Sequence, residues 1–204
     1  TSSASARAAA GPPVPVEIYF NVAASGLLTG LVYGLMALGL SVIFGVVRVV
    51  NFAHGEMMTL AMYLTLVLFS ALKLDPLVLL VPVAAALFVF GYLLQLGLIN
   101  PFINRPEHSQ FMLLVAIGLI LVNLQLIVFG PDARGIRTAY SFDSFQLGAL
   151  IVDAAKVYAA GAALVVAAAL FAFFRFTLLG KSIRACADNY EGARVVGLNV
   201  KHLY

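Results

Sequence analysis

An imidazole and a carboxylate, His54 and Glu56, lie two residues apart in a short polar motif that follows a long uncharged stretch. Ionisable groups near membrane depth are costly and often functional, so this pair is a candidate metal site or proton relay. Positions two apart on a helix do not face each other, however. The spacing therefore favours a loop or a helix start, with Gly55 supplying an unusual backbone angle. The motif consists of Asn51, Phe52, Ala53, His54, Gly55 and Glu56.

Three uncharged polar residues, Gln95, Asn123 and Gln125, lie within otherwise apolar segments. They are candidates for contact with a solute, but interhelical hydrogen bonding is the commoner use of such residues. His108 and His202 lie at segment ends or in loops, and no His-Glu-x-x-His motif occurs, which disfavours a haem anchor or a membrane enzyme. The sequence thus predicts no catalytic residue, metal site or cofactor in this chain.

The composition identifies the elements that must position these residues. Of the 204 residues, 63% are hydrophobic and 10% are charged, whereas a soluble domain carries roughly 25% charged residues. We therefore predict an all-α, polytopic membrane protein with five uncharged candidate spans. None of the spans contains Asp or Glu, which disfavours an ion-driven secondary transporter. They are residues 18–47, 57–72, 77–99, 111–130 and 157–174.

The second of these segments is short for a membrane span. Its 16 residues cover about 24 Å at 1.5 Å per residue, less than the roughly 30 Å of the hydrocarbon core. Short or interrupted segments are typical of places where transporters expose backbone to a polar pathway. We therefore expect this segment to be tilted or partly re-entrant, and the break at residues 51–57 to mark the translocation path.

Small residues recur on one face of the first segment, at Gly26, Gly30 and Gly34. Small residues at this spacing let the backbone of a neighbouring helix approach closely. We predict that this stripe packs tightly against another helix.

The charges of the loops predict the orientation in the membrane. Cations are densest after the fifth segment, and positive loops remain in the cytoplasm. Counting back from that segment places the N-terminus and the 131–156 loop outside, and Arg48, His54 and Glu56 on the cytoplasmic side. The cations of the cluster are Arg175, Lys181, Arg184, Arg194 and Lys201.

The net charge, the N-terminal composition and the single cysteine support three further expectations. The net charge is +3, but the cations form no basic stripe with interleaved aromatic residues, which excludes nucleic acid as a partner. Residues 1–17 are rich in Ala, Ser and Pro, a composition that predicts a flexible tail. The lone Cys186 is expected to be a free, reduced thiol.

A short capped helix is predicted at residues 188–197 of the basic segment. Asp188 can cap a helix whose N3 residue is Glu191, and Gly197 can take the left-handed conformation that ends it. Taken alone, this pattern predicts an ordered polar loop.

Two sequence blocks together resemble the branched-chain amino acid permease family of bacterial ATP-binding-cassette (ABC) importers. The first is residues 37–45, ALGLSVIFG, leading into the motif at 51–56, and the second is residues 180–187, GKSIRACA, leading to Gly197. Within the second, Glu191-x-Ala193-x-x-x-Gly197 is similar to the core of the importer loop that docks on the ATPase, with Gly192 in place of the central Ala of that core.

The resemblance implies a domain organisation and a set of partners. Residues 18–204 are expected to form a C-terminally incomplete permease domain, with a cytoplasmic coupling segment at about 176–201. The implied partners are a second related permease, two cytoplasmic ATP-binding subunits, a periplasmic solute-binding protein and membrane lipid. The implied location is the bacterial inner membrane. The ATPase-coupling residues would be Asp188, Glu191, Ala193 and Gly197.

Branched-chain amino acids are the solutes that this resemblance implies. Some relatives of the family handle urea or short amides with a similar first block, which keeps these solutes as an alternative. The chain contains no Gly-x-x-x-x-Gly-Lys-Ser/Thr phosphate loop, so ATP hydrolysis is expected on partner subunits.

Overall fold

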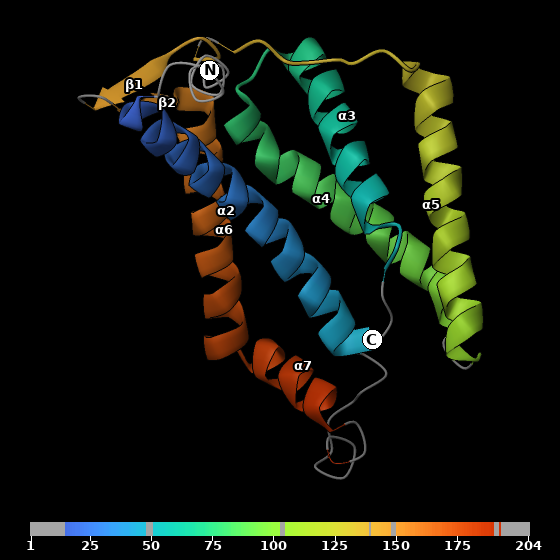
Figure 1. The fold of residues 1–204 in the computed structure, drawn as a ribbon. Coiled ribbons are helices and arrows are strands. Elements are labelled where there is room, and N and C mark those ends of the chain that lie inside the picture. Colours follow the sequence, from blue (N-terminus) through green and yellow to red (C-terminus); the bar gives the residue numbers. More distant parts are fainter. Residues whose placement is uncertain are drawn as a thin grey trace, which may run out of the picture. The chain divides into compact units, whose positions relative to one another are not determined.

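Helices dominate the structure, a computed structural model that describes residues 15–47, 51–102, 105–138, 140–147, 150–189 and 192. Within these residues, five helices are long and apolar enough to cross a membrane, which confirms the predicted all-α polytopic fold (Figure 1). The α-helices are α2 (Val16–Val47), α3 (His54–Leu72), α4 (Pro76–Leu94), α5 (Glu107–Phe129), α6 (Ala154–Phe176) and α7 (Leu178–Asp188). A π-helical turn, η1 (Gln95–Ile99), and a short 3-10 turn, η2 (Asn100–Phe102), continue α4.

The second span is longer than the sequence predicted. Helix α3 begins at His54 and has 19 residues, so it covers about 28 Å, close to the thickness of the hydrocarbon core. The difference arises because the ionisable residues of the motif join the helix instead of preceding it. Helix α2 likewise begins at Val16, inside the segment predicted to be a tail, and residues 1–14 of that tail lie outside the described residues.

The chain divides into two compact units, residues 1–35 with 139–165 and residues 36–138 with 166–204, and the boundaries fall within α2 and α6. In the first unit, an antiparallel hairpin of β1 (Ser144–Leu147) and β2 (Leu150–Asp153) interrupts the predicted loop. The Asn21 side-chain oxygen of α2 accepts a hydrogen bond from the Ile151 backbone N–H at 2.8 Å. The Lys156 ammonium donates to the Ser25 hydroxyl at 2.6 Å. These two bonds fasten the hairpin and the start of α6 to the first turns of α2.

The glycine stripe of α2 does not make the predicted close helix contact among the described residues. A Cβ atom added at Gly26, Gly30 or Gly34 would meet nothing within 4 Å. The stripe is therefore open in the described part of the chain, and its packing against another helix stays a prediction. Because α2 is apolar on every side, residue types do not indicate which face meets a neighbour.

In the second unit, α3 packs against both α4 and α5. Its buried core consists of Ala53, Leu114, Ile117 and Leu121. Higher on the same pair of helices, the rings of Tyr63 and Phe129 stack with their centroids 4.1 Å apart. Helix α4 is started by Asp75, whose carboxylate accepts from the Leu77 N–H at 2.8 Å, with Pro76 in the first turn.

A sharp elbow joins α6 to α7. The Thr177 hydroxyl accepts from the Gly180 backbone N–H at 3.0 Å, which caps the start of α7. Gly180 is buried, and a Cβ atom there would clash with the Phe173 carbonyl oxygen and lie 2.6 Å from the Phe174 Cα. Only glycine fits this close approach of the two helices.

Replacing Gly180 with Ala should therefore destabilise the protein, by about 1–3 kcal/mol for forced overpacking. The measurement is thermal unfolding of the purified protein in detergent. Gly161→Ala is the matched control, because Gly161 is a helical glycine of α6 with nothing within 4 Å of its added Cβ, and it should gain about 0.5–1 kcal/mol. An unchanged unfolding temperature for Gly180→Ala would contradict the tight elbow.

Candidate functional site

The polar motif forms a hydrogen-bonded turn followed by a helix start. The Asn51 side-chain oxygen accepts from the Ala53 N–H at 3.0 Å, and the Asn51 carbonyl oxygen accepts from the His54 N–H at 3.1 Å. Asn is suited to this geometry because its short side chain bonds the backbone two residues on. The turn residues Asn51 and Phe52 thus direct the chain into α3.

His54 is the first residue of α3 and contacts α2. Its Nε2 atom lies 3.3 Å from the Met36 carbonyl oxygen, and a Cβ added at Gly39 would lie 3.6 Å from the imidazole Cε1. The expectation of a helix-start role is confirmed, and this imidazole bridges two helices. Gly55 has ordinary helical geometry, since the positive φ angles of the described residues are at Lys73 and Gly130. The prediction of an unusual angle at Gly55 is therefore wrong.

Helix α5 closes over the turn from the other side. A Cβ added at Gly118 would lie 3.6 Å from the Ala53 Cα and 3.9 Å from the Glu56 Cγ. The Gln125 side-chain amide donates to the Glu56 carbonyl oxygen at 3.0 Å, and Gln125 is only 4% exposed. Gln125 thus makes the predicted interhelical bond, and Ala53 is fully buried.

The other two polar residues of the spans bond locally. Asn123 donates to the Leu119 carbonyl oxygen of its own helix at 2.6 Å. Gln95 donates to the Asn100 side-chain oxygen at 3.0 Å, across the π-helical turn. Within the described residues, these two side chains bond their own segments, so the interhelical expectation holds for Gln125 and not for Asn123 or Gln95.

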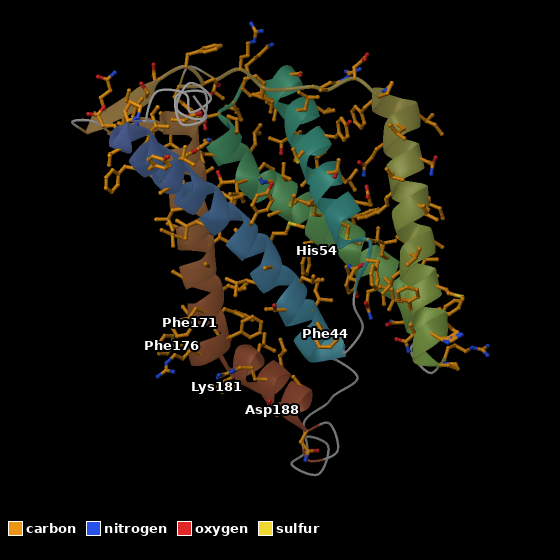
Figure 2. All side chains as sticks on the ribbon, viewed as in Figure 1. Phe44, His54, Phe171, Phe176, Lys181 and Asp188 are labelled. Atoms are coloured by element: carbon orange, nitrogen blue, oxygen red, sulfur yellow. The ribbon has the colours of Figure 1, made fainter. Side chains whose placement is uncertain are left out.

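The turn lies at half the length of α5. Gly118 is residue 12 of the 23 residues that run from Glu107 to Phe129, and it contacts Ala53. Figure 1 shows the same arrangement, with α3 starting at mid-height of α5, and Figure 2 marks His54 at this level. The turn thus packs against the middle of α5, and the side of the membrane on which it lies stays a prediction.

A cavity of about 340 Å³ opens beside the turn. It is lined by apolar side chains of α2, α4 and α5 and by the carboxamides of Asn51, Gln95 and Gln110. Among the residues that the structure describes, no charged side chain lines it. The π-helical turn that carries Gln95 forms one wall, and such turns are frequent at functional sites. The cavity can accommodate an apolar group and offer hydrogen bonds to a neutral polar one.

The predicted coupling segment is only partly described. Glu191, Ala193 and Gly197 lie outside the described residues. Asp188 is the last residue of α7. Asn189 has extended backbone angles, and its side-chain oxygen accepts from the Gly192 N–H at 2.9 Å. Because an N-cap requires non-helical angles, Asp188 belongs to α7 and does not start the predicted helix; apart from residues 189 and 192, the rest of that helix lies outside the described residues.

Five apolar candidate spans with a polar turn and an adjoining cavity characterise a polytopic membrane protein and are typical of transport proteins. A family model described as branched-chain amino acid transport system / permease component matches residues 22–204. The chain belongs to this family.

Curated relatives agree with this assignment. The chain is 25% identical over 199 residues to the high-affinity branched-chain amino acid transport system permease protein BraD of Pseudomonas aeruginosa, covering 91% of this chain and 64% of BraD. It is 24% identical over 188 residues to the corresponding LivH proteins of Salmonella typhimurium and Escherichia coli, covering 86% of this chain and 61% of theirs. The chain thus spans less than two thirds of these relatives. No solved structure matches it.

The contribution of α5 to the site was not predicted from the sequence. It comes from Gly118, and a single glycine in an apolar helix gives no signal of what it contacts. Gln125 was singled out as polar, but its partner, a backbone carbonyl 69 positions away, has no counterpart in the residue pattern.

The packing of the turn against α5 predicts a specific cross-link. The Cβ positions of residues 53 and 118 are 3.9 Å apart, inside the roughly 3.5–4.5 Å range of disulfides. In a Cys186→Ser background, the pair Ala53→Cys and Gly118→Cys should therefore oxidise to an intramolecular disulfide, read as a mobility shift after protease cleavage between α3 and α5.

The matched control for this cross-link is Ala53→Cys with Gly91→Cys. Gly91 has nothing within 4 Å of its added Cβ, so this pair should remain reduced under the same oxidant. Equal oxidation of both pairs, or none at residues 53 and 118, would contradict the placement of the turn against α5.

Proposed function

We propose that this chain is the transmembrane permease subunit of an ATP-binding-cassette importer and forms part of the pathway for branched-chain amino acids across the bacterial inner membrane. The observation that carries the proposal is the family match over residues 22–204, and the buried turn with its adjoining cavity supplies the physical setting. The N-terminus is proposed to be outside, on the basis of the loop charges.

The partners follow from what this chain lacks and from what its family does. Since the chain has no phosphate loop, two cytoplasmic ATP-binding subunits would supply hydrolysis. A second related permease would complete the pathway, and a periplasmic solute-binding protein would deliver the solute. ATP binding would then move the segment at 176–201 and alternate the bundle between outward and inward openings.

The residues that line the cavity indicate which classes of solute fit it. Its apolar side chains suit the branched aliphatic side chains of leucine, isoleucine and valine. The carboxamides of Asn51, Gln95 and Gln110 favour the second candidate, urea or short amides, because amides pair with such groups by two hydrogen bonds.

Uptake by the whole system tests the function. In cells lacking their own branched-chain amino acid transporters, the full-length protein and its partners should restore uptake of labelled leucine. Gly118→Leu should lower that uptake at least about tenfold, since overpacking against Ala53 costs about 1–3 kcal/mol. Gly118→Ala should transport normally, because its Cβ makes ordinary contacts.

Labelled urea and acetamide, supplied in the same cells, separate the two solute classes. Uptake of urea or acetamide without leucine uptake would reassign the substrate. Equal transport by Gly118→Leu and the unmodified protein would remove the turn from the pathway.

The coupling role of residues 188–197 has its own test. Ala193→Trp should block docking sterically, so the variant should insert and assemble with the second permease but lose copurification of the ATPase. Asn189→Ala, which removes a cap worth roughly 0.5–2 kcal/mol, should weaken this association partially. Full substrate-stimulated ATP hydrolysis by Ala193→Trp in reconstituted vesicles would show that the segment is an ordinary loop.

A further inference from the structure

A second cavity lies at the α6–α7 elbow, away from the polar turn. It has a volume of about 440 Å³ and lies between the last part of α2, the last part of α6 and α7. Its walls are apolar, with Leu170, Phe171 and Phe174 from α6 and Ile183 from α7. The proposed transport function makes no use of this cavity.

Two arginines, Arg175 and Arg184, are among the residues that line the same cavity. Arg175 lies in the last turn of α6, and its guanidinium carbon is 6.0 Å from the centre of the Phe176 ring. Among the described residues, no carboxylate forms an ion pair with either arginine. The cavity therefore combines an apolar wall with two positive charges that the described part of the chain does not neutralise.

The elbow has the character of a membrane interface. Phe176 is 71% exposed and Leu178 is 83% exposed, and both lie where a membrane-spanning helix ends. Figure 2 shows Phe171 and Phe176 at this end of α6 and Lys181 in the first turns of α7. Helix α7 is amphipathic, with Gly180 and Cys186 on its buried side. Large exposed apolar residues at a span end, next to cations, are typical of helices at the headgroup level.

We infer that this cavity binds an anionic phospholipid. One acyl chain would lie along the α6 wall, and the headgroup phosphate would bind Arg175 and Arg184. Guanidinium groups match phosphate oxygens in a bidentate geometry, and basic pockets between helices at the membrane surface bind anionic headgroups. A helix of another subunit is the rival occupant, but it would satisfy the apolar wall without requiring two arginines.

A tryptophan reporter tests this site directly, since the chain contains no Trp. The full-length protein carrying Phe171→Trp is purified and reconstituted with brominated phosphatidylglycerol or brominated phosphatidylcholine. Quenching should favour phosphatidylglycerol, and each of Arg175→Gln and Arg184→Gln should lower that preference about fivefold, because each removes one charge-assisted contact with the headgroup phosphate.

Two controls isolate the cavity. Lys181→Gln removes the same charge from α7, but Lys181 does not line the cavity, so the preference should persist. A reporter at Leu164→Trp, an exposed residue of α6, should be quenched equally by both lipids. Thermal unfolding of each variant, measured in the same bilayers, verifies that it is folded.

Three results would overturn the inference. Equal quenching of the Phe171→Trp reporter by the two lipids would show no headgroup selection. An equal loss of preference in Lys181→Gln and Arg184→Gln would reduce the effect to general surface charge. No quenching by either lipid would show that protein fills the cavity.

Discussion

A break in the backbone within a membrane-spanning bundle must have its polar groups satisfied by protein, because hydrocarbon offers no hydrogen bonds. The rest of the second unit depends on how this constraint is met at residues 51–56. Asn51 bonds the turn from within, His54 reaches α2, and Gln125 reaches in from α5. Ala53 and Gly118, having little or no side chain, permit the close approach that these bonds require. The hydrogen bonds of the turn and the small residues that permit them therefore depend on one another.

The sequence predicted the elements well and their contacts poorly. The five spans were evident because uncharged runs of that length have few other uses. The contacts between spans were not evident, since they depend on pairs such as Ala53 with Gly118 and Glu56 with Gln125, which are far apart in the chain. The same limit applies to α2, because an all-apolar helix does not encode which face meets a neighbour.

The local signals for helix ends were visible in the sequence, but their positions were not. Asp188 and Asn189 are both residue types that favour an N-cap, and Asp188 is instead the last residue of α7. Helix α7 itself was missed, although Thr177 before the helix and the apolar spacing of Leu179, Ile183 and Cys186 indicate it. Its buried side rests on Gly180, whose contact with Phe173 is invisible in the sequence. Helix ends are thus set jointly by local signals and by the close packing around them.

The π-helical turn at Gln95–Ile99 has a consequence for the side chains that follow it. A π turn holds more residues than an α turn, so each residue beyond it is rotated by about 100° relative to an uninterrupted α-helix, one residue's worth of phase. Leu98 is 43% exposed, whereas Ile99 and Phe102 line the cavity beside the turn. The extra residue in the π turn thus determines which side chains of this span line the cavity, because it rotates the residues that follow it about the helix axis.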